Sequence, residues 1–203
     1  KKLDEIEKES QELNKSFDQQ EEQQEDIQQE QNKAKSDLQK NKKEEAAKAQ
    51  KNAAKKMKKM AEDMQQQMQS AEMQQAEIDL NALREILENL IKVSHDQEKV
   101  MKTFKNLAVS DPRFVSLSQD QLNIANDAKI IEDSLFTLAS RVMQLEATVT
   151  KEVTAMKNHI DESVKLIRER KLPMAAARQQ NSMTSMNNLA LLLSDVFKQM
   201  QQQ

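Results

Sequence analysis

Apolar residues recur along this chain at the spacing that places side chains on one face of an α-helix. From residue 131 to 167 they follow one another at steps of three, four or seven. A second stripe, of Met, Leu, Ala and Phe, runs from Met183 to Met200. The first stripe comprises Ile131, Leu135, Leu138, Val142, Leu145, Val149, Met156, Ile160 and Ile167. The pattern predicts an all-α protein without β-structure.

The first helix is expected to be very long, because no residue that commonly interrupts a helix precedes Leu107. Pro112 lies in the segment 109–117, which also contains Ser and Asp, and it predicts a turn there. Ser118 and Gln121 have the spacing of a capping box, which predicts that the second helix begins at 118.

Pro173 predicts the last turn, because proline ends a preceding helix and suits the first turn of the next. Helices of about 56–108, 118–171 and 174–203 are then expected to fold back on one another. The predicted domain is an antiparallel three-helix bundle or coiled coil over residues 56–203. Residues 1–55 are expected to form a charged, Gln-rich helical arm, coiled or frayed, with no partner in this chain.

The apolar pattern of the arm is weaker than that of the bundle. Residues 1–41 fit a heptad repeat whose core positions are about half polar. One core position holds Ile6, Leu13, Gln20, Ile27 and Ala34. Between 46 and 71 the apolar residues fit an eleven-residue repeat, typical of straight or slightly right-handed packing. They are Ala46, Ala49, Ala53, Met57, Met60, Met64, Met68 and Ala71.

The composition narrows the possible functions. The 203 residues include no Gly and no Cys, and only 2% are aromatic. Phosphate-binding loops and most α/β enzyme folds need glycine in tight turns, and thiol chemistry needs cysteine. No run of about 18 apolar residues could span a bilayer. An enzyme is therefore the least favoured class of protein.

Charge is separated along the first helix. Residues 1–32 hold four Lys and eleven Asp or Glu, a net charge of −7, whereas 33–59 hold eleven Lys and three acids, a net charge of +8. This charge separation has three interpretations. The blocks could pair with a partner that has complementary charge blocks, they could form a nucleic-acid or lipid patch, or they could belong to a solvated arm. The whole chain has a net charge of −3 and the basic block lacks Arg, so no nucleic-acid partner is expected.

Few residues suggest chemistry. His95 and His159 are expected to lie about 40 Å apart in the three-helix register, too far to share a metal ion. The methionines near one end of the predicted bundle are interpreted as adaptable core. They are Met57, Met60, Met64, Met68 and Met73, with Met174, Met183 and Met186 expected at the same end. An exposed partner groove and a Cu(I) site are the alternatives. We expect no catalytic, cofactor-binding or metal-binding residue.

Three segments resemble a known family: Glu88–Glu98, Asp111–Phe114 followed by Leu122, and Met186–Asp195. Over about 57–203 the chain is similar to the helical extramembrane region of large, uncharacterised membrane-anchored proteins of Bacteroidota. This resemblance implies a piece of a longer cell-envelope protein on the periplasmic side of the inner membrane, anchored outside the segment. The motifs are not catalytic signatures, and no functional residue carries over from them.

The leading hypothesis is a non-enzymatic scaffold that presents helix faces to protein partners. Self-association or partner binding is expected through residues 1–55 and the bundle faces. The alternative is a chaperone-like holdase whose Met-rich faces bind apolar segments of client proteins.

Overall fold

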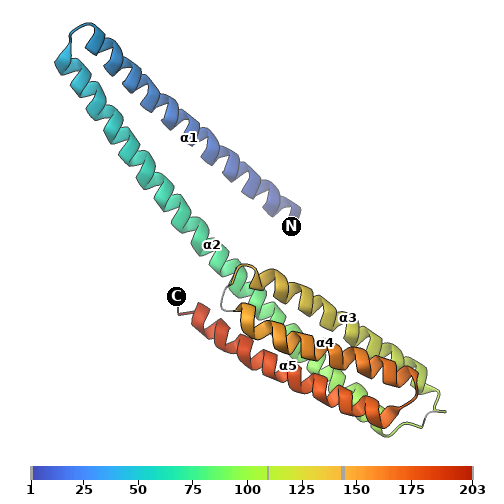
Figure 1. Ribbon diagram of the computed structural model, residues 1–203. Coiled ribbons are helices and arrows are strands. Elements are labelled where there is room, and N and C mark those ends of the chain that lie inside the picture. The colour runs from blue at the N-terminus through green and yellow to red at the C-terminus, as the bar shows by residue number, and fades with distance from the viewer. Residues whose placement is uncertain (1, 109, 143–144, 203) are drawn as a thin grey trace. The chain divides into compact units, whose positions relative to one another are not determined.

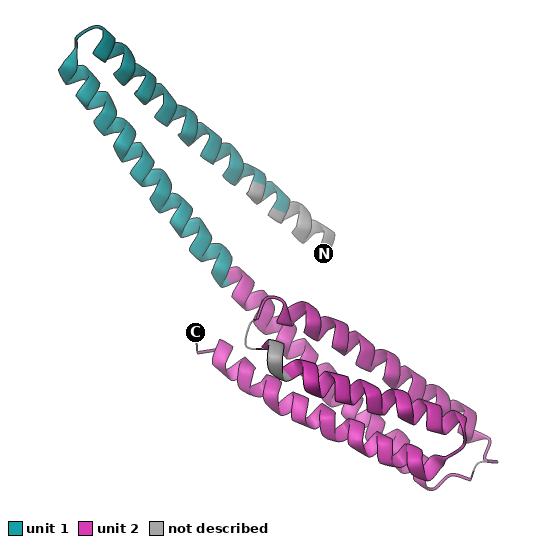
Figure 2. Ribbon diagram, viewed as in Figure 1, with its two compact units in different colours: residues 1–73 teal, residues 74–203 magenta. Residues whose placement is uncertain are grey.

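The computed structural model describes residues 2–108, 110–142 and 145–202, and every regular element in these ranges is a helix. The elements are α1 (Lys2–Gln39), α2 (Lys43–Lys105), α3 (Arg113–Ala139), α4 (Glu146–Arg168) and α5 (Leu172–Met200) (Figure 1). The all-α prediction is confirmed. The chain forms two compact units, residues 1–73 and 74–203, so the boundary lies after 73 and not after 55 (Figure 2).

Unit 1 is an antiparallel hairpin in which α1 packs along the N-terminal part of α2 (Figure 2). Three side-chain hydrogen bonds of 3.0–3.2 Å join the helices: Gln20 to Gln67, Gln23 to Asp63, and Lys56 to Asp26. The prediction that residues 1–55 have no partner in this chain is therefore wrong. Ile6 and Leu13 of the predicted heptad have side chains outside the described part of the structure.

The turn between α1 and α2 also corrects the prediction of one uninterrupted first helix. Asn41 has a φ of 60°, the left-handed conformation that usually follows a helix end. Its N–H donates to the carbonyl of Leu38 at 3.0 Å, and the N–H of Lys42 donates to that of Asp37 at 2.9 Å. This pair of bonds is a Schellman motif. Asparagine tolerates this backbone better than other residues except glycine, and Asn41 was the sequence signal for the turn.

Unit 2 contains four helical segments among its described residues: the C-terminal part of α2, then α3, α4 and α5 (Figure 2). Successive segments run antiparallel, and polar contacts join neighbours around the bundle. These contacts are Gln97–Gln121, Glu132–Lys157, Glu162–Arg178 and Ser94–Asn187. The expected single helix 118–171 is broken at 140–145, so a four-helix arrangement replaces the predicted three-helix bundle.

The break at 140–145 has no proline, glycine or left-handed residue among its described positions. Tertiary packing supplies the reason. The predicted stripe 131–167 folds back on itself, so that Ile131, Leu135 and Leu138 of α3 share one core with Val149, Met156 and Ile160 of α4. Burial of both halves favours the reversal over a continuous helix that leaves part of the stripe in water.

Two helix starts test the sequence predictions. Pro173 lies in the first turn of α5, as predicted. The capping box at Ser118 is wrong, because α3 begins at Arg113 and the Ser118 hydroxyl donates to the carbonyl of Phe114 at 2.7 Å within the helix. Arg170 precedes α5 with a φ of 59°, in a second Schellman motif.

The turn before α3 contains an ion pair with a predictable titration. The Arg113 guanidinium and backbone N–H donate to the Asp111 carboxylate at 2.7–3.0 Å and lower the pKa of Asp111 to about 2. Since this pKa lies below the ordinary value near 4, the bonds stabilise the turn above about pH 4. That stability is lost as the pH falls through about 2.

We expect the Asp111 side-chain ¹³C resonance to titrate near pH 2, and Arg113→Gln to move its midpoint upward, toward the ordinary range. The Arg113 backbone N–H remains in the variant, so part of the shift remains. An Arg178→Gln variant, which removes an ion pair elsewhere, is the control. Identical Asp111 titrations in wild type and Arg113→Gln would contradict the assignment.

Candidate functional site

The seam between the two helices of unit 1 is lined mainly by small residues. Ala46, Ala49 and Ala53 of α2 are buried against α1, where Ile27 and Ala34 are buried in turn. These positions alternate at steps of three and four, so they form one face of each helix. The eleven-residue repeat predicted for 46–71 therefore separates into two stripes, of which this seam is one.

The second stripe of α2 is exposed along its whole length. It follows steps of three and four beside the seam, and we call it the open stripe. Its members are Ala47, Gln50, Ala54, Met57, Ala61, Met64, Met68 and Ala71. Met64 is 42% and Met68 65% exposed. Seven of the eight side chains are apolar, so helix α2 leaves an apolar face in water.

The exposed apolar residues of α1 lie on the same side of the hairpin. Phe17, which is 62% exposed, and Leu38 directly follow Ser16, which bonds to α2, and Asp37, which is buried. Met57 and Met64 likewise directly follow Lys56 and Asp63, which bond to α1, so these four preceding residues also belong to the seam. In an antiparallel helix pair, residues that directly follow seam residues line one common side. The opposite side is polar, with Asp26 of α1 and Lys59 of α2 among its residues. Unit 1 is therefore an amphipathic hairpin.

The hairpin also redistributes the charge blocks of the sequence. Residues 33–59 surround the turn between α1 and α2, so their net charge of +8 gathers at one end of unit 1. Residues 1–32 and the following part of α2 make the other end acidic. Within the hairpin, Lys56 reaches Asp26 at 3.0 Å, and both side chains are exposed enough to be well solvated.

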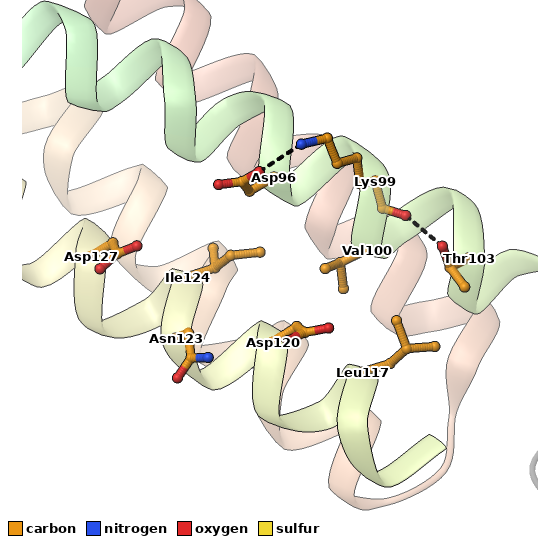
Figure 3. A pocket seen from close by; sticks show the side chains of 9 residues that line it. All are labelled: Asp96, Lys99, Val100, Thr103, Leu117, Asp120, Asn123, Ile124 and Asp127. Carbon is orange, nitrogen blue, oxygen red and sulfur yellow. Dashed lines mark hydrogen bonds and ion pairs between the residues drawn. The ribbon is translucent and has the colours of Figure 1, made fainter. Parts of the chain in front are cut away.

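An acidic groove of 390 Å³ lies between α2 and α3 of unit 2 (Figure 3). Val100 and Ile124 point toward each other across its floor. Asp96, Asp120 and Asp127 are distributed along its length, and Lys99 pairs with Asp96 at 3.0 Å. The full lining is Asp96, Lys99, Val100, Thr103, Leu117, Asp120, Asn123, Ile124 and Asp127. The groove is open to solvent, and its carboxylates are spread rather than convergent.

A larger, more apolar pocket of 770 Å³ lies at the end of unit 2 that holds the α2–α3 and α4–α5 turns. Phe104, Leu107 and Leu172 contribute apolar walls, and Lys105 and Arg170 add positive charge. The Arg170 guanidinium also stacks over the Phe114 ring, with 5.6 Å between its carbon and the ring centroid.

Three buried glutamines form a hydrogen-bonded cluster inside unit 2. Gln97 of α2 and Gln121 of α3 exchange two amide bonds of 2.9 Å, and Gln179 of α5 donates to the Gln121 oxygen at 2.6 Å. All three are at most 1% exposed. The Oε1 atom of Gln179 has no partner among the described residues. Three of the four helical segments are thus joined through Gln121, for which the sequence pattern predicts a role in a capping box.

The histidines and methionines behave differently from each other. His95 is exposed and His159 is half-buried, and no group of three potential metal ligands occurs among the described residues. Met174 lies at the start of α5 and Met186 is fully buried in unit 2. The methionines at 57–73 belong to unit 1 and those at 174–186 belong to unit 2, so their predicted clustering at one end of a single bundle stays a prediction. The methionines of the open stripe are exposed, so the adaptable-core interpretation is wrong for them.

These features define a class of protein: an all-α chain with one closed helical bundle and one amphipathic hairpin whose apolar side is uncovered. Comparison with protein-family models, curated proteins and solved structures found no match to this chain. Among the described residues, no helix is long and apolar enough to cross a membrane.

Proposed function

We propose that this chain is a non-enzymatic protein-interaction module, in which unit 2 is the stable body and unit 1 presents the docking face. The open stripe is the observation that supports this function most directly. Exposed apolar side chains that form one continuous helical stripe are typical of interaction surfaces, whereas isolated ones are common on any protein.

The chemistry of the open stripe suits the docking of a helix. Its side chains recur at helical spacing, as do the anchor positions in recognition of one helix by another. Methionine adapts its shape to a partner at little cost, and alanine allows close approach of the partner backbone. Burial of Met57, Met64 and Met68 would each contribute on the order of 1 kcal/mol from the apolar area removed from water.

The test is a Met64→Lys variant of the tagged full chain. We expect the amount of co-purifying protein recovered with this variant to be at least about tenfold lower than with wild type, because a buried unpaired charge opposes docking. Met174→Lys is the matched control, since Met174 is also exposed (58%, against 42% for Met64) but belongs to unit 2. Quantitative mass spectrometry of the bound protein, including differently tagged copies of this chain, gives the readout. Equal recovery with both variants would contradict the proposal.

A holdase is the second candidate, and the exposure of three methionines in one stripe favours it. In that case the open stripe binds unfolded segments of many clients, and Met64→Lys weakens suppression of client aggregation. A heterogeneous bound set identifies the holdase, whereas one stoichiometric protein identifies the scaffold.

The resemblance of 57–203 to the Bacteroidota family supports a place in the cell envelope, which cell fractionation with immunodetection tests.

A further inference from the structure

The occupant of the docking face can be inferred from the open stripe itself, if the proposed function holds. We propose that it is a second copy of this chain, whose open stripe pairs antiparallel with the first. The two hairpins then bury their apolar sides against each other about a two-fold axis near the middle of the stripe.

The open stripe is self-complementary when it is reversed. With the axis between Ala61 and Met64, each of these residues lies opposite the other in the second copy. Met57 then lies opposite Met68, and Ala54 opposite Ala71. Every member of the stripe from Ala54 to Ala71 thus meets another member, and the large side chains at the centre are flanked by small ones. Close-packed interfaces need this match of side-chain volumes.

The charge of α2 favours the antiparallel orientation. Residues 43–59 hold seven Lys and two Glu, a net charge of +5, and residues 60–79 hold five acids without Lys or Arg, a net charge of −5. An antiparallel pair places the basic half of each α2 beside the acidic half of the other. A parallel pair in register places like charges together, which is unfavourable.

Individual charges can be assigned to the edge of the paired stripes. Lys51, Lys58 and Glu72 lie on the face of α2 next to the open stripe, away from α1, by their helical positions. In the antiparallel register, Lys51 of one copy lies near Glu72 of the other. Symmetry produces this pair twice in each dimer. Neither Lys51 nor Glu72 has a described ion-pair partner within its own chain.

The helix α1 completes the interface. Phe17 and Leu38 lie on the same side of the hairpin as Met57 and Met64 and are exposed in the single chain. Two hairpins that meet through this side place the paired open stripes at the apolar centre, while α1 contributes Phe17 and Leu38 and otherwise polar residues such as Gln24 and Gln28. The seam of the single hairpin is mostly alanine and buries little apolar area. A second copy covers the apolar surface of the open stripe that the single hairpin leaves in water.

The first test exchanges the charges. Lys51→Glu and Glu72→Lys should each weaken self-association of the full chain about tenfold, because each variant dimer contains two repulsive pairs. An equimolar mixture of the two variants should associate as tightly as wild type, since both pairs in the mixed dimer are again attractive. Sedimentation equilibrium measures this, and Lys92→Glu, on the unit 2 part of α2, is the control.

The second test determines whether the two α2 helices pair antiparallel or parallel. The chain has no cysteine, so any disulfide must form through the introduced residue. Ala54→Cys and Ala71→Cys, each alone, should form little disulfide dimer on oxidation, because equal positions lie about 25 Å apart in the antiparallel register. Their mixture should form the mixed disulfide. Efficient cross-linking of Ala54→Cys to itself would show a parallel pair and overturn the inference.

A wild-type chain that is monomeric in solution also overturns the proposed self-association. This holds if the docking face binds a different protein, and equally if the basic end of unit 1 binds anionic vesicles. The proposed function stands in the first case, provided that Met64→Lys removes that protein. If Met64→Lys changes neither self-association nor any other binding, both proposals are wrong.

Discussion

Replacement of Gln121 by methionine is expected to lower the free energy of unfolding of unit 2 by about 2–4 kcal/mol. Methionine matches glutamine in length and volume, so the loss comes from hydrogen bonding rather than from a cavity. Gln121 accepts from Gln97 and Gln179 and donates to Gln97. Its removal leaves two buried amides without their partners, and each pays the cost of desolvation.

Chemical denaturation followed by circular dichroism measures this change. Gln119→Met on the exposed side of α3 is the control, with an expected change below about 0.5 kcal/mol. The triple variant with methionine at 97, 121 and 179 should recover most of the lost stability, since no unpaired amide remains. A triple variant less stable than Gln121→Met would show that packing, and not hydrogen bonding, dominates at this cluster.

The second large effect concerns the apolar core of unit 2. Leu135→Ala should destabilise unit 2 by about 3 kcal/mol, because Leu135 is fully buried and its truncation leaves a cavity. Ile130→Ala on the same helix is the control, since Ile130 is 63% exposed. Its expected effect is below about 0.5 kcal/mol.

Hydrogen exchange resolves where the Leu135→Ala effect is felt. The apolar core cluster of the described residues begins at Leu83 and includes no residue of unit 1. We therefore expect faster exchange for amides of α3, α4 and α5, and unchanged exchange for α1. Equal acceleration in α1 and α3 would mean that the two units unfold as one.

Most of the local structure could be predicted from the sequence, because helix formation depends on neighbouring residues. The spacing of Ile131, Leu135 and Leu138 predicted a buried helical face, and Pro173 predicted the start of α5. Asn41 was a missed local signal, since asparagine can end a helix where glycine is absent. The candidate site was harder to predict from the sequence. The methionines at 57–68 stand out in the sequence, but their pattern predicted core residues rather than an exposed face.

The tertiary structure decided what local patterns leave open. The chain reverses direction between α3 and α4 although the sequence there contains no proline or glycine, because the two halves of one apolar stripe gain more by packing together than by forming one helix. Gln121 becomes a buried cluster residue only because α2 and α5 bring Gln97 and Gln179 to it. The periodic residues of 46–71 separate into a covered seam and an open stripe only when α1 folds onto α2. A sequence determines which side chains share a helical face, but burial of that face depends on what packs against it.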